Sequence, residues 1–247
     1  MKAERSAQLR LLDLQDLDST LDQLTQRRAS LPELALINGL ETERDGISDE
    51  MVFARTAVSD LRRAQDKADS DVEQVKARRV RTQQRLDQGQ VSSPRELEAL
   101  QHEITSLDRR IGDLEEAEIE VMEQLEAAET DLTEKEQRLE QVAGELTTHE
   151  RSRDEALAGI DVDLEQSRAA RDKIAAEIPA DLMALYTRLR TNQSGVGAAE
   201  LAHGRCGGCR LELNPADLRG IAAAADDDVM RCEECGRILV RTEEPKG

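Results

Sequence analysis

Asp87-Gln-Gly-Gln-Val-Ser-Ser-Pro94 decides the fold of this 247-residue chain, because it separates two long helical patterns. Gly89 and Pro94 both disfavour the interior of a helix. Ser93-Pro94-Arg95-Glu96 has the form of a capping box with proline at the first helical position. The stretch therefore predicts that one helix ends and a second begins across a turn at 88–94.

Apolar residues recur at alternating spacings of three and four on both sides of this turn. Thirteen of the 15 seam positions from Leu97 to Leu146 are apolar, and ten of the 14 from Leu40 to Leu86. A helix with such a stripe must bury it against another helix. The pattern predicts a mainly α fold, built on a long antiparallel coiled-coil hairpin that occupies residues 1–178.

Each arm of the predicted hairpin changes the phase of its apolar seam once. The first arm slips around Pro32 and the second after Leu146, at nearly the same distance from the turn. We expect a kink or a change of packing near 32–39 and 143–157. The alternative is a pair of independent stutters without a bend.

Composition agrees with a coiled coil. Charged residues make up 35% of the chain, and aromatic residues only 1%. Residues 1–180 carry 25 basic and 42 acidic side chains, whereas residues 181–247 carry 9 and 11. The acidic arms repel nucleic acid, so the tail is the less repulsive end.

The chain shows no sign of a membrane segment. Its first residues, Met1-Lys2-Ala3-Glu4-Arg5, lack the apolar core of a signal peptide. No apolar run approaches the length of about 18 residues that a membrane helix needs. We expect a cytoplasmic protein, where reduced thiols favour metal binding over disulfides.

The tail after Pro179 reads as a different kind of structure. Residues 179–195 suggest a short amphipathic helix and a linker, and 196–247 a small β-containing domain. Strand-like segments surround two cysteine turns, and Asn214-Pro215 marks the start of a small helix. The segments expected as strands are 196–202, 211–213, 229–231 and 238–241.

The four cysteines of the chain form two matched pairs, Cys206-Gly-Gly-Cys209 and Cys232-Glu-Glu-Cys235, separated by 22 residues. Two thiolates on one tight turn can both reach a Zn²⁺ ion at about 2.3 Å, and two such turns complete a tetrahedral shell. The motif predicts one structural Zn²⁺ in a C4 zinc ribbon over 196–247.

Other readings of this motif stay open. A rubredoxin-like iron site uses the same ligands, although such sites usually lie among aromatic residues. A redox dithiol does not come in matched pairs at this spacing. His203 could replace one cysteine, although four thiolates already fill the shell.

Two sets of basic residues are candidate contacts for nucleic acid. Arg205, Arg210, Arg231 and Arg237 flank the cysteines; they could bind phosphate, or only offset the charge of the metal site. Near the predicted turn, a stretch without acids holds Lys76, Arg78, Arg79, Arg81 and Arg85. These could form a basic patch, or they could pair with acids at the start of the second arm.

No catalytic motif appears in the sequence. There is no phosphate-binding glycine loop, no Gly-x-Ser-x-Gly and no H-E-x-x-H, and the three histidines are scattered. A closed shell of four thiolates has no open position for water, so the metal is not suited to hydrolysis. We therefore expect a protein that is not an enzyme.

Two segments resemble a known bacterial family with an N-terminal coiled coil and a C4-type zinc ribbon, in an actinobacterial form. They are Ser93-Pro-Arg-Glu-Leu-Glu-Ala-Leu-Gln-His-Glu-Ile104 and the tail from Gly195-Val-Gly-Ala-Ala-Glu-Leu201 to Cys232-Glu-Glu-Cys235-Gly-Arg-Ile-Leu239. The resemblance implies a hooked helical hairpin with the ribbon at its base and the four cysteines as zinc ligands. It also implies nucleic-acid binding, or partners such as sigma factors; nothing in the sequence encodes the flagellar role of some members.

Two functions compete on this evidence. The first is an adaptor whose ribbon contacts nucleic acid, either RNA or DNA, or the transcription machinery, with the coiled coil as a spacer or docking arm. The second is a protein–protein scaffold with a purely structural zinc site, which suits the acidic arms better. The hairpin could be a monomer or could pair through its remaining seam residues.

Overall fold

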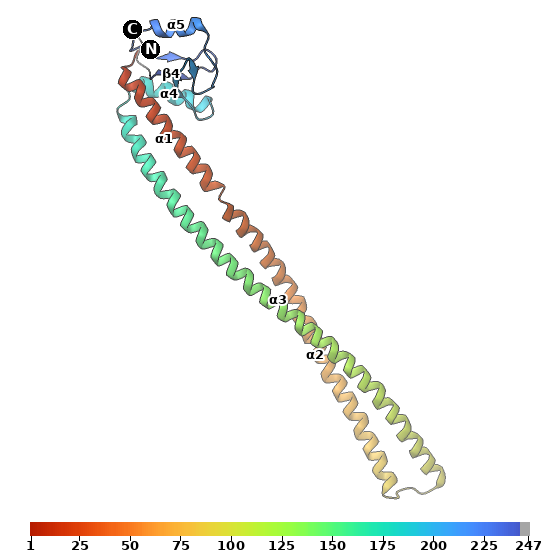
Figure 1. Cartoon of the computed structure of the whole chain (residues 1–247). Coiled ribbons are helices and arrows are strands. Elements are labelled where there is room, and N and C mark those ends of the chain that lie inside the picture. Colours follow the sequence, from red (N-terminus) through yellow and green to blue (C-terminus); the bar gives the residue numbers. More distant parts are fainter. Residues whose placement is uncertain (243–247) are drawn as a thin grey trace. The chain divides into compact units, whose positions relative to one another are not determined.

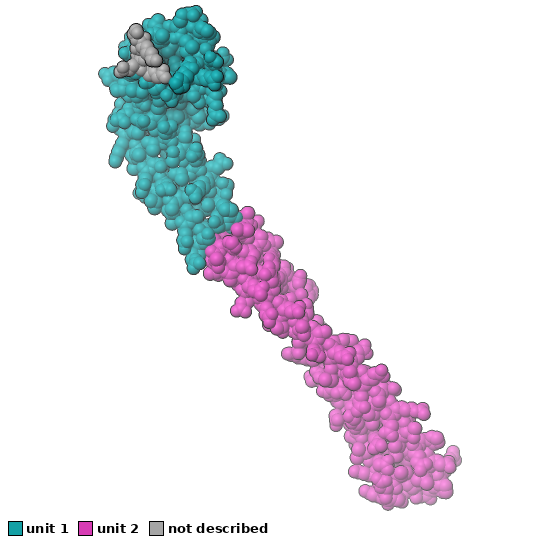
Figure 2. All heavy atoms as spheres, viewed as in Figure 1, with its two compact units in different colours: residues 1–34, 151–247 teal, residues 35–150 magenta. Residues whose placement is uncertain are grey.

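The computed structural model describes residues 1–242 and separates into two compact units. The first unit combines Met1–Leu34 with the chain from Arg151 onward, and the second is Ala35–Glu150 (Figure 2). The last five positions of the predicted ribbon, 243–247, lie outside the described residues.

The described chain has five helices and four short strands, and the fifth helix lies between the second and third strands (Figure 1). Helices α1 (Arg5–Ala29), α2 (Pro32–Asp87) and α3 (Pro94–Ala176) form the hairpin. They confirm the mainly α fold with a coiled-coil hairpin and a small β region near the C-terminus.

The turn of the hairpin is held by the chemistry of its capping residues. The Ser93 hydroxyl accepts a hydrogen bond from the Glu96 N–H at 3.3 Å. The Glu96 carboxylate reaches back one residue further than expected and accepts from the N–H and hydroxyl of Ser92. The turn also uses Gly89 at φ +63°, a left-handed conformation that glycine adopts readily.

The helix break in the first arm lies at Ser30 and Leu31, between α1 and α2. In contrast, α3 runs without interruption from Pro94 to Ala176, across the second phase slip. The kinks expected near 32–39 and 143–157 stay a prediction.

The second unit packs the apolar seams of α2 and α3 against each other. Met51, Val58 and Val72 of α2 are buried, as are Val142 and Leu146 of α3. Ion pairs flank this seam, among them Arg138–Glu43 and Lys135–Glu50. These pairs are partly or largely exposed to solvent, so each adds little stability.

The first unit has the larger core, where the base of the hairpin meets the tail. Leu11 and Leu14 of α1 pack with Leu182 and Tyr186 of α4 (Ala180–Asn192) and with Ile238 from the sheet. All five side chains are fully buried. The short helix after Pro179 is therefore part of the core that joins the ribbon to α1.

The sheet has the order β2-β1-β4-β3. Two antiparallel hairpins, β1 (Ala198–Ala202) with β2 (Arg205–Cys206) and β3 (Met230–Arg231) with β4 (Ile238–Arg241), each carry one cysteine turn. The hairpins are joined by a parallel pairing of β1 with β4, which the sequence pattern does not predict. Helix α5 (Pro215–Ala223) follows Asn214, whose side chain caps it.

The first residues of the chain also join this unit. The Ala3 N–H donates to the Asp227 carbonyl at 2.8 Å, and the Val229 N–H donates to the Met1 carbonyl at 3.1 Å. Lys2 pairs with Asp227 at 2.8 Å. Among the described residues, no helix is both long enough and apolar enough to cross a membrane.

Candidate metal centre

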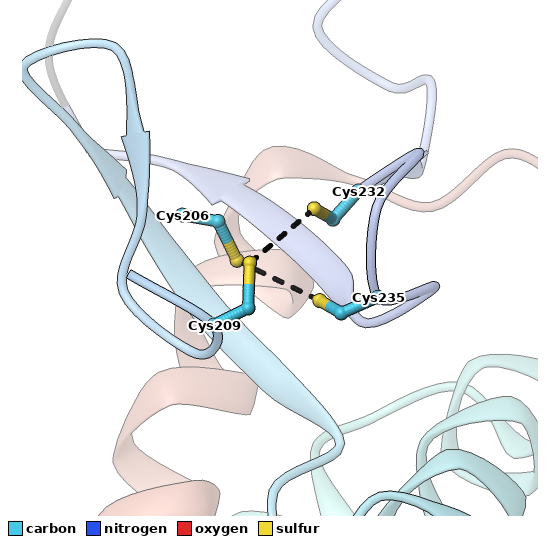
Figure 3. Close-up of side chains that lie close together, drawn as sticks. All are labelled: Cys206, Cys209, Cys232 and Cys235. Carbon is cyan, nitrogen blue, oxygen red and sulfur yellow. Dashed lines mark hydrogen bonds between the residues drawn. The ribbon is translucent and has the colours of Figure 1, made fainter. Parts of the chain in front are cut away.

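Two short turns built on the same plan bring the four cysteines together (Figure 3). In the first turn, the Cys206 carbonyl accepts from the Arg210 N–H at 2.7 Å, and the Cys206 N–H donates to the Leu211 carbonyl. In the second, the Cys232 carbonyl accepts from the Gly236 N–H at 2.7 Å, and the Cys232 N–H donates to the Arg237 carbonyl. Each Cys-x-x-Cys segment thus closes into a loop that points both of its sulfurs to one side.

The sulfur positions fit a tetrahedral zinc ion. All four Sγ atoms lie within 4.8 Å of one another, and the pairs Cys206–Cys235 and Cys209–Cys232 are each 3.9 Å apart. A tetrahedron with Zn–S bonds of about 2.3 Å has sulfur–sulfur edges of about 3.8 Å. The cysteines therefore form the ligand set of one structural Zn²⁺, as the motif predicts.

The surroundings of the sulfurs set how easily each thiol loses its proton. Burial raises the pKa of Cys206, and it raises the pKa of Cys232 to about 12. Burial acts in the same direction on Cys235, but hydrogen bonds from the backbone and side chain of Arg237 and from neighbouring thiols lower its pKa to about 7. Bound zinc would keep all four groups as thiolates and compensate the cost of burying them.

Close packing around the turns depends on one glycine in particular. A Cβ atom on Gly208 would lie 2.5 Å from Cδ of Arg237. The Arg237 guanidinium in turn donates to the carbonyls of Val196 and Gln193, each at 2.9 Å. Arg237 therefore links the second cysteine turn to the chain that enters β1.

The other predicted basic contacts near the metal differ in what they do. Arg231 donates to the Gly236 carbonyl at 2.8 Å and so stabilises its own turn. Arg205 forms a long, exposed ion pair with Glu212 at 3.9 Å. Arg210 is exposed, adopts φ +64°, and makes no side-chain hydrogen bond or ion pair within residues 1–242.

The basic residues near the hairpin turn are mostly paired with α3. Lys76 pairs with Glu115, Arg79 with Asp108 at 2.8 Å, and Arg85 with Glu96 at 3.6 Å. Arg78 pairs with Glu103. Arg81 has no ion pair with any residue that the structure describes.

The sequence pattern does not reveal a buried polar network that fixes the ribbon to α1. The side chain of Asp18 is 4% exposed and accepts hydrogen bonds from Tyr186 at 2.7 Å and from Arg171 at 2.8 Å. Arg190 approaches the same carboxylate at 3.4 Å. One turn earlier, Gln15 accepts from the Gly197 N–H at 2.7 Å and donates to the Gly195 carbonyl.

A clue to this network was present in the sequence. Asp18 and Gln15 lie between Leu14, Leu17 and Leu21 of α1, where buried polar residues require partners. Nothing in the pattern identified Tyr186, Arg171 or Arg190 as those partners. His203, weighed as a ligand, lies in the turn between β1 and β2 at φ +50° and outside the cysteine cluster.

These features define a class of protein, an antiparallel coiled-coil hairpin that carries a C4 zinc ribbon. The family model described as "CT398-like coiled coil hairpin domain" matches residues 14–194, and "C4-type zinc ribbon domain" matches residues 205–239. The chain belongs to the CT398-like coiled-coil hairpin family, which confirms the resemblance seen in the sequence. Neither matching family is described as catalytic.

Relatives in mycobacteria support this assignment. An uncharacterized protein of Mycobacterium tuberculosis is 36% identical over 98% of both chains, and one of Mycobacterium leprae is 28% identical over 90% of this chain and 95% of the relative. A solved structure from Mycobacterium smegmatis has a TM-score of 0.81 at 34% identity and covers 98% of this chain and all of that one.

A more distant solved structure shares the fold. CT398 from Chlamydia trachomatis has a TM-score of 0.67 at 17% identity and covers 96% of this chain and 98% of its own.

Proposed function

We propose that this protein is a non-enzymatic adaptor that binds a protein partner through its coiled-coil hairpin, with the zinc ribbon as a structural module. The observation that carries this proposal is that most of the candidate phosphate-binding side chains already form hydrogen bonds or ion pairs within the chain. Arg231 and Arg237 bond to backbone carbonyls, and Lys76, Arg78, Arg79 and Arg85 pair with acids of α3.

The remaining surface of the hairpin favours a protein partner over a polyanion. Residues 1–180 hold 42 acidic and 25 basic side chains, and most of the basic groups described above are already paired. A surface with this excess of negative charge repels phosphate backbones. The thiol chemistry of the ribbon suits a reducing compartment, so we place the adaptor in the cytoplasm.

Cross-linking in native cells, followed by purification of the tagged full-length protein, tests this proposal. Protein and RNA that co-purify are both sequenced, with and without nuclease treatment before purification. We expect defined protein partners in the same yield in both samples. Loss of all partners on nuclease treatment would reject the adaptor and leave nucleic-acid binding as the explanation.

Nucleic-acid binding through the first cysteine turn is a second candidate, favoured by two observations. Arg205 and Arg210 line the same shallow surface hollow beside Cys206 and Gly207, and Glu200 is the one acidic residue of its lining. Arg210 also holds a strained left-handed backbone conformation, where the equivalent position of the second turn is Gly236. Strain of this kind persists most often at functional sites.

A charge reversal at this hollow separates the two candidates. We compare Arg205→Glu/Arg210→Glu with the matched control Arg168→Glu/Arg188→Glu, which makes the same change at exposed positions of α3 and α4. If the second candidate holds, RNA or DNA binding falls at least tenfold in the first variant only. Arg237 is not suitable for this test, because its guanidinium supports the turn. Equal binding by both variants would remove the hollow as a contact surface.

A further inference from the structure

One section of α3 is unlike the rest of the chain in its charge. Residues 111–134 contain ten acidic side chains and no lysine, arginine or histidine. All of them lie in the second unit and on a single helix. Elsewhere in both arms, basic residues are interspersed with the acids.

Most of these acids lack a cation within the described part of the chain. Glu115 pairs with Lys76, Glu129 with Arg62, and Asp131 with Lys135. The other seven make no ion pair within residues 1–242; they are Asp113, Glu116, Glu118, Glu120, Glu123, Glu126 and Glu134.

Asp69 of α2, which faces Glu118 of α3, adds to the negative charge of this section. Glu118 shares a hydrogen bond with Asp69, and burial together with that contact raises the pKa of Glu118. Two carboxyl groups in contact share a proton or attract a cation, because like charges at this range destabilise each other. The hairpin therefore holds an uncompensated acidic surface on α3.

Two large apolar side chains are exposed within the same section. Ile119 is 56% exposed and Met122 is 47% exposed, and three-residue spacing puts them on one face of the helix. A shallow hollow beside them is lined by Gln65, Ile119, Met122, Glu123, Leu125 and Glu126. The same face of α3 continues with the exposed side chains of Glu126, Ala127, Thr130, Asp131 and Glu134.

We propose that this 119–134 face of α3 is a docking surface for a basic amphipathic helix of a protein partner. The inference rests on the proposed adaptor function and gives it a location and a chemistry. The apolar row of the partner helix would cover Ile119 and Met122, and its lysines or arginines would pair with the acids beside them. Helices that dock in grooves use apolar anchors at spacings of three and four in this way.

Charge complementarity decides between the possible occupants. A second copy of this chain would bring the same acidic section to the interface, and its basic stretch near the hairpin turn is mostly paired with its own α3. Nucleic acids and anionic membranes carry the same sign of charge as the face. A basic amphipathic helix brings both an apolar row to cover Ile119 and Met122 and positive charge to pair with the acids. The 119–134 face is about 23 Å long, equal to about four helical turns of such a partner.

Binding of a labelled peptide to the full-length protein tests the proposal. The probe is an 18-residue helix-forming peptide with leucines in one row and lysines on both sides of it, and its control is a scrambled peptide of the same composition. Fluorescence anisotropy at two salt concentrations gives the affinities. We expect the amphipathic peptide to bind at least tenfold more tightly than the scrambled one.

Variants with matched controls localise the binding. Ile119→Ser/Met122→Ser and Glu123→Lys/Glu126→Lys should each weaken binding at least tenfold. The controls lie at exposed positions elsewhere on α3: Val162→Ser makes one change from apolar to serine, and Asp163→Lys/Glu165→Lys makes two from acid to lysine. Both should change the affinity less than twofold. Far-UV circular dichroism confirms that each variant keeps its helices.

The outcomes distinguish this inference from the proposed function. Equal affinity for the scrambled peptide, or undiminished binding by the two 119–134 variants, would overturn the docking face. If those variants still recover the native protein partners in cells, the adaptor stands and only the face is wrong. If the peptide binds the face but cells yield no nuclease-resistant protein partner, the adaptor itself is wrong.

Discussion

At the scale of single residues, the two cysteine turns share the same backbone hydrogen bonds but differ in the residue that closes each turn. Gly236 closes the second turn at φ +72°, whereas Arg210 closes the first at φ +64°. A left-handed conformation costs a residue with a Cβ atom about 1–2 kcal/mol, and glycine avoids that cost. The first turn is therefore strained by its own sequence.

Relieving this strain should stabilise the ribbon. We expect Arg210→Gly to raise the free energy of unfolding by about 0.5–1 kcal/mol, because the left-handed penalty exceeds the added chain entropy of glycine. Gly236→Ala should lower it by about 1 kcal/mol for the converse reason. Chelator-induced unfolding of the zinc-bound protein measures both; a destabilised Arg210→Gly variant would contradict this account.

Zinc affinity should depend steeply on pH. Burial raises the pKa of Cys206 and Cys232 in the folded ribbon, and in the unfolded, metal-free ribbon a cysteine thiol keeps a pKa of about 8.5, so in either state both are protonated at pH 7 and must each release a proton on binding zinc. With at least two protons released, affinity should weaken by about a hundredfold for each unit that the pH falls. Competition with a zinc indicator between pH 6 and 8 measures this slope. A slope of tenfold or less would mean that most thiols are already ionised before the metal binds.

At the scale of secondary-structure elements, the packing of α3 and α4 against α1 at the base of the hairpin depends on Asp18. This carboxylate receives hydrogen bonds from α3 through Arg171 and from α4 through Tyr186. Burial and the contact with Asp18 raise the pKa of the Tyr186 phenol, so Tyr186 stays a donor across the physiological range. One buried side chain thus joins three helices at the base of the hairpin.

Removing the charge of Asp18 should weaken the first unit. We expect Asp18→Asn to cost about 2–3 kcal/mol, because Arg171 and Arg190 lose their shared partner while remaining only about a quarter exposed. Asp22→Asn, one turn further along α1, is the matched control; its pair with Arg190 is more exposed and should be worth less than about 1 kcal/mol. Thermal unfolding of both variants measures the difference, and equal effects would refute a special role for Asp18.

At the scale of the whole molecule, metal and hairpin contribute separately to stability. The second unit, Ala35–Glu150, contains no cysteine and holds its own apolar seam. The ribbon has a small core around Cys206, Leu239 and Ile221, in which the cysteines themselves are members. Domains with so little apolar area depend on their metal to fold.

Removing zinc should therefore unfold the ribbon and leave the hairpin helical. We expect a chelator to abolish protection from hydrogen exchange in β1 and β4 and to leave protection in the seam of the second unit unchanged. The far-UV helical signal should fall by less than about a fifth, since the ribbon holds little helix. A collapse of most of the helical signal would show that the metal supports the hairpin as well.

Local sequence patterns were sufficient to predict the hairpin, its turn and the metal ligands. The seam from Leu97 to Leu146, the breakers at Gly89 and Pro94, and the paired cysteines each act over a few residues or one helical repeat. These patterns therefore predict structure without any knowledge of the tertiary fold. A continuous apolar stripe needs a partner helix, and two close thiolate pairs need a metal.

Tertiary structure alone decided the contacts between residues far apart in the chain. No periodic pattern in the sequence predicts the parallel pairing of β1 with β4 or the hydrogen bond from Tyr186 to Asp18. The same is true of the hydrogen bonds from Arg237 to backbone carbonyls. They arise because folding brings polar groups into places where burial leaves them no water, so each must find whichever partner the packing supplies. For the same reason, the sequence could propose Arg237 as a surface contact, and only the fold shows it bound to the carbonyls of Val196 and Gln193.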